Sequence, residues 1–388
     1  MRIITKTVLI LSVVSLLNDI ASEMLYPVIP VYLREIGFTV LWIGVLEGLA
    51  NFTAGISKGY FGKMSDEKGL RLPFVKWGYL LSTISKPLIT FFVYPLWIFF
   101  VRTMDRLGKG VRTAARDALL SKEATKETKA RVFNFHRGMD TLGATIGPIL
   151  ALLFLYFYPG RYKTIFLLAF IPGIISLVFL FLLKEKKQPA STIGKGSFLS
   201  YFKYWKIATP EYKKLVKGLV LFALFNSSDI FLLLKTKEVT GNDTLTIAAY
   251  VFYNFVYAAS SYPFGVLADK FSLRKIFLFG LILFTIVYAG FAFNPSTVVV
   301  YILFFIYGLY AATSEGIIKA WISNIAQNEN TATAIGFYTS CESICALFAS
   351  IIAGALWSNF GSASTFLITA GFTFLVMIYF TTKFKPGK

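Results

Sequence analysis

Residues 62–71 read Gly-Lys-Met-Ser-Asp-Glu-Lys-Gly-Leu-Arg, and residues 265–274 read Gly-Val-Leu-Ala-Asp-Lys-Phe-Ser-Leu-Arg. The two stretches carry Gly, Asp and Arg at identical internal spacing, and the second follows the first by 203 residues. Each comes directly after a long apolar run. A repeat of this period in a chain of 388 residues predicts two similar halves, with a binding site at their interface near the middle of a membrane.

The composition excludes an ordinary water-soluble domain. Hydrophobic residues make up 56% of the chain and charged residues only 15%, against roughly 25% in soluble domains. One bilayer crossing takes roughly 20 apolar residues. The apolar runs therefore predict an all-α polytopic membrane protein with twelve transmembrane helices in two pseudo-symmetric six-helix bundles. The expected helices are 7–33, 40–61, 73–93, 96–120, 131–158, 164–183, 215–234, 244–268, 274–293, 297–322, 332–358 and 362–382.

The formal net charge of +19 would indicate nucleic acid as a partner in a soluble protein. Here the Lys and Arg residues lie mostly in alternate short segments between the apolar runs. Such segments stay on the cytoplasmic side of a membrane. We therefore expect a multi-pass protein of the cytoplasmic (inner) membrane, with both termini cytoplasmic and no nucleic-acid partner.

The longest polar segment divides the helices six and six. We expect a first bundle at 1–183, a cytoplasmic linker at 184–214 and a second bundle at 215–388. Part of the linker is amphipathic and aromatic. Two interpretations stay open for it: a helix in the membrane interface, or a helix packed under the bundle. The aromatic residues concerned are Phe198, Tyr201, Phe202, Tyr204 and Trp205.

The chain has twelve predicted helices divided by a basic linker, with this loop after the second helix and again after the eighth. This arrangement resembles the major facilitator superfamily. In that family the loop stabilises the outward-facing state, and its Asp caps a neighbouring helix end and pairs with basic residues. The second copy has Ser272 where the family's second Gly would be. The resemblance implies a cytoplasmic gate, to which we assign Gly62, Asp66, Gly69, Arg71, Gly265, Asp269, Arg274 and Lys275.

Helix 131–158 contains Gly138, Gly143, Gly147 and Pro148. This pattern resembles the glycine-rich motif of antiporters in the superfamily, although the Gly pair expected after the proline is missing. Small residues at this spacing also allow ordinary close packing of helices. The pattern favours export or exchange over uptake.

Ionisable residues inside the predicted helices are costly unless they face a cavity or one another. Carboxyl groups in a partly dry cavity are suited to carry protons. Asp19 is our first candidate for proton coupling and Glu23, one turn further, the second. The proton-coupling set is Asp19, Glu23, Arg102, Asp229 and Glu342.

Helix 96–120 carries a stripe of charged side chains at steps of three or four residues, which we expect to face helices 7–33 and 131–158. It resembles the family's Arg-Gly motif, in which Arg102 or Arg106 would act. The remaining charged positions fit a gate, in which Arg112, Arg116 and Asp117 would form salt bridges with the loop 62–71. A proton relay is the alternative for His136. The gate candidates are Arg112, Arg116, Asp117, His136 and Arg137; the substrate-cavity candidates are Asn18, Tyr26, Lys86, Arg102, Arg106, Asp140, Asn226, Tyr253 and Tyr257.

These features predict a monomeric secondary transporter that moves a small organic solute by alternating access, coupled to protons, with export favoured. Uptake of an anionic metabolite or siderophore is the alternative, because Lys86, Arg102 and Arg106 would attract an anion. A membrane enzyme is a remote alternative, because no Asp-x-x-Asp, His-x-x-x-His or phosphate-binding Gly-Lys-Ser/Thr motif is present. A sensor or lipid flippase with this fold is a third possibility. We expect no cofactor and no metal.

Overall fold

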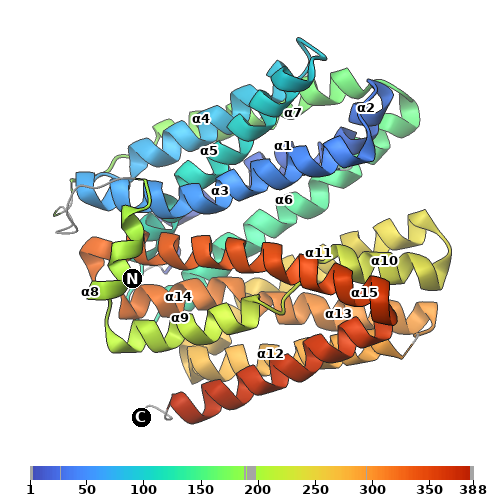
Figure 1. Ribbon diagram of the computed structural model, residues 1–388. Helices are drawn as coiled ribbons and strands as arrows, with labels where there is room; N and C mark the ends of the chain where they lie inside the picture. The colour runs from blue at the N-terminus through green and yellow to red at the C-terminus, as the bar shows by residue number, and fades with distance from the viewer. Residues whose placement is uncertain (1–2, 27, 188, 190–197, 294, 385–388) are drawn as a thin grey trace. The chain divides into compact units, whose positions relative to one another are not determined.

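The fold is all-helical in a computed structural model that describes residues 3–26, 28–187, 189, 198–293 and 295–384 (Figure 1). Part of the expected linker, 188 and 190–197, lies outside these residues. Every regular element of the described chain is an α-helix or a short 3-10 helix. The first half contains α1 (Lys6–Glu23), α2 (Val28–Glu35), α3 (Val40–Lys68), α4 (Leu72–Leu88), α5 (Pro95–Lys122), α6 (Lys129–Phe157) and α7 (Tyr162–Phe181).

The second half repeats this succession of long helices after the linker. It contains η1 (Ser200–Lys203), α8 (Tyr204–Ile207), α9 (Pro210–Ala223), α10 (Ile230–Thr240), α11 (Asp243–Phe271), α12 (Leu273–Ala292), α13 (Thr297–Ala312), α14 (Glu315–Ile325), η2 (Asn328–Asn330) and α15 (Thr331–Lys383). The last helix changes direction at Gly361, whose φ of +81° is in the left-handed region that favours glycine. Helical segments of the described chain occupy all twelve positions at which crossings were expected.

Three expected crossings are not single helices. The first is divided into α1 and α2, the seventh into α9 and α10, and the tenth into α13 and α14. The break in the seventh falls on a polar run, Asn226 to Asp229. Ser, Asn and Asp side chains compete with the helical backbone for hydrogen bonds. One such bond joins the Ile230 amide to Ser228 Oγ at 3.4 Å.

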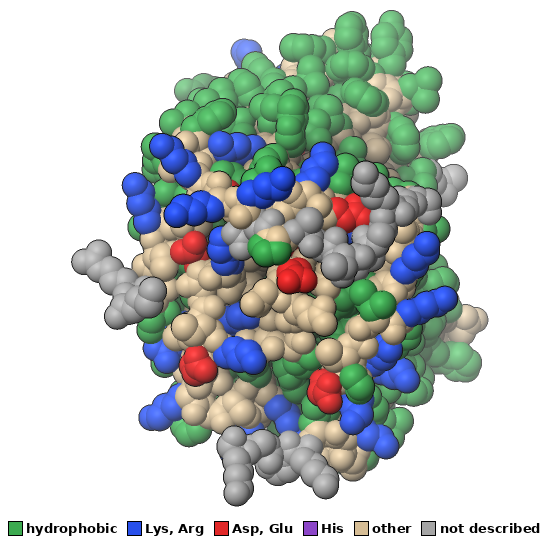
Figure 2. Space-filling model, turned by 90° about the vertical axis from the view of Figure 1, so that its left-hand side faces the viewer, with side chains coloured by type: hydrophobic (Ala, Val, Ile, Leu, Met, Phe, Trp, Pro, Cys, Tyr) green, Lys and Arg blue, Asp and Glu red, His purple; other side chains and the backbone are tan. Residues whose placement is uncertain are grey.

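The surface has the composition of a membrane protein. Five helical stretches of the described chain are long and apolar enough to cross a membrane. On α7, apolar side chains such as Val178 and Phe181 are exposed, as expected for contact with lipid. On the face shown in Figure 2, Lys and Arg side chains are more plentiful than Asp and Glu.

The helices form two compact units. The first comprises residues 1–125, 139–207 and 326–340, and the second comprises 126–138, 208–325 and 341–388. The units therefore depart from the sequence halves at two segments. The start of α6 packs with the second unit, and the start of α15 packs with the first.

The described part of the linker packs against protein in the first unit. Tyr201 and Tyr204 are buried, and Lys63 Nζ of α3 donates to Ser200 Oγ at 2.8 Å. The ring of Trp205 stacks on Phe337 at the start of α15, with centroids 5.7 Å apart. Of the two interpretations of this segment, the structure supports the packed one.

Helices α4 and α5 cross at unusually short range. A Cβ added at Gly78 would lie 2.6 Å from the Gly108 carbonyl oxygen, and a Cβ at Gly108 would lie 2.6 Å from that of Gly78. Two glycines facing each other therefore let the backbones touch. This crossing fixes which side chains of α5 meet α4.

We expect Gly78→Ala to destabilise the protein, because a methyl group would push against helix backbone that cannot yield cheaply. The cost should be about 1–3 kcal/mol, visible as a lower Tm of the purified protein in detergent. Gly48→Ala on α3 is the matched control, since a Cβ there meets nothing within 4 Å and alanine favours the helix. Equal Tm values for the two variants would contradict the close crossing.

Candidate functional site

The loop 62–71 places a buried carboxylate at the start of α15. Asp66 Oδ2 accepts from the Thr333 amide at 2.7 Å and from its hydroxyl at 2.9 Å. Asp66 Oδ1 accepts from Arg71 Nη2 at 2.9 Å, and the same nitrogen donates to the Asn328 carbonyl at 3.1 Å. An acidic side chain at a helix start satisfies free amides and complements the helix dipole. Asp66 and Arg71 thus hold the first turn of α15.

The charge state of Asp66 depends on its burial and on its partners. The helix α3 has 29 residues, about 44 Å at 1.5 Å per residue, and so extends beyond a hydrocarbon core of about 30 Å. Asp66 lies on its last turn, outside the expected crossing 40–61. Burial raises the pKa of Asp66 to about 6, while Arg71 and the two Thr333 hydrogen bonds act in the opposite direction. The ionised form at neutral pH therefore depends on these partners.

The loop 265–274 has a different set of partners. Asp269 accepts from the amides of Ala130 and Arg131 at 3.0 and 3.2 Å and from Arg131 Nε at 3.0 Å. It therefore caps the start of α6. Arg274 donates instead to the carbonyls of Phe380 and Thr381, at 3.1 and 2.9 Å, near the end of α15. The spacing of Asp and Arg is the same in both loops, but only the first forms an Asp–Arg pair within the loop.

The first glycine of each loop permits a close approach. A Cβ at Gly62 would lie 2.6 Å from the Ala332 carbonyl oxygen, and a Cβ at Gly265 would lie 2.8 Å from that of Ala130. The second glycine is different. Gly69 has a left-handed φ of +63°, whereas Ser272 has an extended φ of 164°, so the second loop does not require glycine there.

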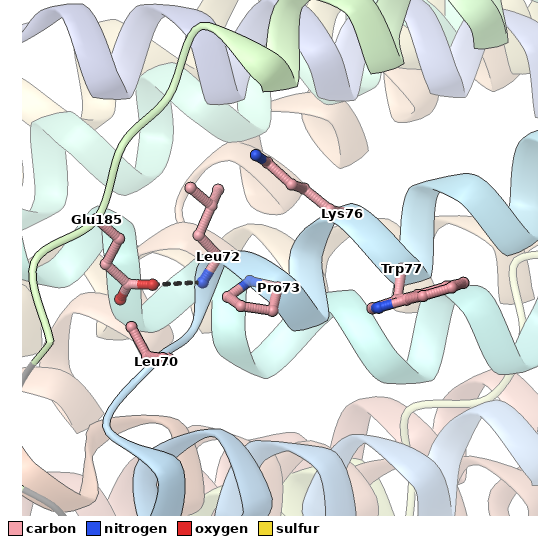
Figure 3. A pocket seen from close by; sticks show the side chains of 6 residues that line it. All are labelled: Leu70, Leu72, Pro73, Lys76, Trp77 and Glu185. Carbon is pink, nitrogen blue, oxygen red and sulfur yellow. Dashed lines mark hydrogen bonds between the residues drawn. The ribbon is translucent and has the colours of Figure 1, made fainter.

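The linker supplies a residue that the sequence did not reveal. Glu185 Oε2 accepts from the amides of Arg71 and Leu72 at 2.8 and 2.7 Å, and so caps α4 (Figure 3). Arg71 is thereby held at its amide by Glu185 and at its guanidinium by Asp66. Its sequence neighbours are lysines, and no local pattern distinguishes this acid from an ordinary linker charge.

Two acids come together inside the first unit. Asp19 on α1 faces α6 one turn from Asp140: a Cβ added at Gly143 would lie 3.0 Å from Asp19 Cβ, and the two carboxyl groups interact electrostatically. Repulsion between two neighbouring carboxylates favours a proton on one of them. Ser15 Oγ donates to Asp140, and Arg116 Nη1 donates to Ser15 Oγ at 3.0 Å. Asp140, assigned to the substrate cavity from sequence, is therefore a neighbour of the leading proton candidate.

The charged stripe of α5 turns largely toward α4. Arg112 Nη1 donates to Ser82 Oγ at 2.6 Å, and its guanidinium lies 4.4 Å from the Tyr79 ring centroid. Arg116 donates a hydrogen bond to Ser15 of α1 and forms an ion pair with its neighbour Asp117 at 3.2 Å. The ion pairs of Arg112 and Arg116 with the Asp66 loop, expected from sequence, are not among the contacts of these two side chains. The close crossing of α4 and α5 places Ser82 and Tyr79 next to Arg112 instead.

A second charged cluster joins Lys86 of α4 to Arg102 and Asp105 of α5. Lys86 Nζ and Arg102 Nη1 each lie 3.7 Å from an Asp105 oxygen, which is longer than a hydrogen bond. All three side chains are at most 14% exposed. They line a cavity of about 20 Å³ with Ser22 of α1, which is room for about one water. Two cations and one anion leave the cluster with a formal positive charge.

In the second unit, Asp229 is surrounded by tyrosines. Its Oδ1 accepts from Tyr307 OH at 2.6 Å, and the Tyr307 ring lies 5.0 Å from that of Tyr253. Tyr253 and Tyr257, two of the expected cavity residues, are buried. Tyr307 was missed in the sequence, where it is one aromatic residue in an apolar run.

The other candidates lie beside these clusters or beyond them. Arg137 pairs with Glu315 at 2.6 Å and donates to Tyr257 OH at 2.8 Å. Asn18 is fully buried, whereas Tyr26 is 50% exposed. The other positions are less closely defined: Glu23 ends α1, Arg106 follows Asp105, Asn226 precedes α10, His136 is buried on α6, Lys275 begins α12 and Glu342 lies on α15.

The described residues contain no group of three His, Cys, Asp or Glu side chains suited to a metal ion. The site consists instead of buried acid–base clusters within a twelve-helix membrane fold, the architecture of a membrane transporter. The chain belongs to the Major Facilitator Superfamily, whose family model matches residues 11–253 and 219–388. Its members are transporters of small molecules across membranes.

Similar proteins agree with this assignment. An uncharacterized MFS-type transporter of Methanocaldococcus jannaschii is 34% identical over 92% of this chain and 89% of its own length. A multi-drug resistance efflux pump PmrA homolog of Lactococcus lactis is 20% identical over 94% and 91%. The crystal structure of the human organic anion transporter MFSD10 superposes with a TM-score of 0.81 at 15% identity, covering 97% of this chain and 99% of that one. This last likeness is one of fold.

We expect Asp66→Ala to lower the Tm strongly, because it leaves the Arg71 guanidinium buried without its anion and the start of α15 uncapped. Breaking one partner of a buried pair costs about 3–5 kcal/mol. Thermal unfolding in detergent measures the effect. The control is Glu67→Gln, the neighbouring acid, which pairs with Lys63 and is 23% exposed. A loss of Tm no greater than in this control would contradict the capping role.

Proposed function

We propose that this transporter couples the movement of a small organic solute to protons, with export by antiport as the favoured direction. The observation that carries the proposal is the close approach of α1 and α6 that places Asp19 near Asp140. Two acids that share a proton change their joint charge when that proton leaves. In a space with little water, the second negative charge then needs a cation or a new proton before the site can close.

The surroundings of the pair suit such an exchange. Arg116 Nη1 lies 3.9 Å from Asp140 Oδ1 and supplies one positive charge, while Ser15 connects the two side chains. Glu23 adds a negative charge from α1 and Lys109 a positive one from α5. Loss of the shared proton thus leaves two carboxylates beside a buried guanidinium that already pairs with Asp117. A protonated pair carries one negative charge fewer.

The direction of transport rests on weaker support. The glycines of α6 resemble an antiporter motif, and a multidrug efflux pump homolog is 20% identical to this chain. Lys and Arg concentrate in the loops that we place in the cytoplasm, so we infer that both termini are cytoplasmic and that the membrane is the inner one. We also infer that the protein acts as a monomer without nucleic acid.

The second candidate is transport of an organic anion, which the cluster of Lys86, Arg102 and Asp105 favours. Its ion pairs are long, at 3.7 Å, and its formal charge is positive. A carboxylate or phosphate entering beside Ser22 would gain two cationic partners. The two candidates share the proton site and differ in the charge of the solute.

We expect Asp19→Asn to abolish proton movement driven by a solute gradient in proteoliposomes, because the amide cannot exchange a proton. Asp140→Asn should reduce it about a hundredfold or more, the range of a lost acid–base group. The measurement is the fluorescence of a trapped pH indicator, with solutes first selected by thermal stabilisation of the protein at two pH values. Glu211→Gln, an exposed acid on the first turn of α9, is the control. Undiminished proton-coupled flux in Asp19→Asn would refute the role.

If the solute is an anion, Arg102→Gln should weaken its binding about tenfold, the worth of one charged hydrogen bond, and leave lipophilic cations unaffected. Arg102→Lys keeps the charge and should retain most of the affinity. Ligand-induced shifts in Tm across anions and lipophilic cations measure both, and Arg161→Gln, an exposed arginine before α7, is the control. Selective stabilisation by cations, unchanged in Arg102→Gln, would exclude an anion-binding role.

A further inference from the structure

The second unit contains an acid within an expected crossing that has no positive partner. Asp229 lies at the break between α9 and α10, where the seventh crossing was expected as one helix. It forms no ion pair with any Lys or Arg that the structure describes. In the first unit, by contrast, Asp66 pairs with Arg71. A carboxylate at membrane depth is costly unless a cation or a proton neutralises it.

Neutral hydroxyl groups surround this carboxylate. Tyr307 OH donates to Asp229 Oδ1 at 2.6 Å. Tyr253 and Tyr288 interact with Asp229 electrostatically. The carboxylate makes no capping hydrogen bond to the first amides of α10. Hydroxyl donors reduce the cost of a buried charge but do not cancel it, so the site keeps one negative charge when Asp229 is ionised.

The break in the helix leaves backbone oxygen atoms without donors. The Ser228 carbonyl accepts from the Phe231 amide at 3.1 Å. The two preceding carbonyls, of Asn226 and Ser227, accept from no backbone amide of the described chain. The C-terminal end of a helix carries a partial negative charge. The end of α9 therefore adds to the negative potential at the break.

Two hydroxyl groups beside the carboxylate are also unsatisfied. The residues Ser227 and Tyr288 are only 5% and 1% exposed. Ser227 Oγ and Tyr288 OH have no hydrogen-bond partner in the part of the chain that the structure describes. Tyr288 of α12 interacts with both Ser227 and Asp229, so the three side chains lie together. Buried polar atoms without a partner are costly, and a ligand that contacts these oxygens would remove that cost.

The available atoms suit a small monovalent cation. Hydroxyl, carbonyl and carboxylate oxygens are ligands of hard ions, whereas softer metals prefer sulfur or imidazole nitrogen. One carboxylate balances one positive charge, and a divalent ion would leave the second charge uncompensated. A proton would neutralise Asp229 but would leave the other oxygens without partners. In secondary transporters of other folds, broken helices hold Na⁺ with unwound carbonyls in this way.

We propose that the break between α9 and α10 binds a sodium ion. The ligands are the Asp229 carboxylate, the hydroxyl groups of Ser227 and Tyr288, and the free carbonyls of Asn226 and Ser227. The ion joins both parts of the broken crossing to α12 and so stabilises the second unit. This inference does not use Asp19 or Asp140. Because binding is measured without transport, it succeeds or fails separately from the proposed proton coupling.

The test uses the full-length protein purified in a neutral detergent and in choline chloride. Choline is replaced stepwise by Na⁺ or K⁺ at constant ionic strength and pH, and the Tm is measured beside the binding of radiolabelled Na⁺. We expect a saturable rise in Tm with Na⁺ and one bound ion per chain. Binding of K⁺ should be at least about tenfold weaker, since selectivity follows cavity size and ligand number.

Three results would overturn the proposal. The first is an equal Tm in Na⁺, K⁺ and choline, which would leave Asp229 to a proton alone. The second is preference for K⁺ or for an organic cation over Na⁺. The third is a rise in Tm with Na⁺ that never saturates and is not accompanied by bound label, which would indicate a general effect of salt.

Variants locate the bound ion. Asp229→Asn keeps an oxygen for Tyr307 but removes the charge, so the affinity for Na⁺ should fall about a hundredfold or more. Ser227→Ala removes one ligand and should weaken binding about tenfold. In choline its Tm should not fall, because the lost hydroxyl had no partner. A purely structural role of Ser227 would instead lower the Tm equally in both salts.

The controls are matched changes at exposed positions. Glu211→Gln on α9 removes an acid, and Ser358→Ala on α15 removes a hydroxyl. Both should bind Na⁺ as the wild type does. Wild-type affinity in both Asp229→Asn and Ser227→Ala would place any bound Na⁺ elsewhere and overturn the proposal. If Asp229→Asn does not fold, the sodium-dependent shift of Ser227→Ala decides.

Discussion

The cost of an unpaired ion in hydrocarbon governs the interior of this protein. Each unit buries charged side chains, and those described above have partners on their own helix or on another. In the first unit Asp105 lies near Lys86 of α4 and Arg102 of its own helix, and Arg116 pairs with Asp117 of its own helix and lies 3.9 Å from Asp140 of α6. The glycine crossing of α4 and α5 makes the first arrangement possible, because it brings the two helices within side-chain reach.

The two loops show how one short pattern is used twice. Both aspartates cap the start of a long helix, Asp66 at Thr333 and Asp269 at Ala130 and Arg131. In both cases a glycine one turn earlier lets that helix start approach. The arginines then diverge, one to an aspartate and the other to the carbonyl end of α15. The capping carboxylates are thus the common feature, and the arginines adapt to their surroundings.

The fold was largely predictable, because hydropathy reports each crossing locally. The breaks within the crossings were not predictable. The residues on either side of the run from Asn226 to Asp229 are apolar, so this part of the sequence resembles one continuous span. Asp19 was found as a proton candidate because a lone acid in an apolar run is conspicuous. Asp140, its neighbour, was assigned to the cavity, and Glu185 and Tyr307 were missed, because an acid among lysines and a tyrosine among aromatics give no local signal.

The amino-acid sequence by itself predicted a helical membrane protein, the places along the chain where its charged loops fall and the ionisable residues that interrupt its apolar runs. Only the tertiary structure decided which of those residues meet. The helical period indicates that Arg112 and Arg116 share a face of one helix. It does not indicate that Ser82 and Asp140, on other helices, lie opposite that face. Such partners are set by the crossing of helices distant in sequence, and that crossing depends on backbone contacts that no single stretch encodes.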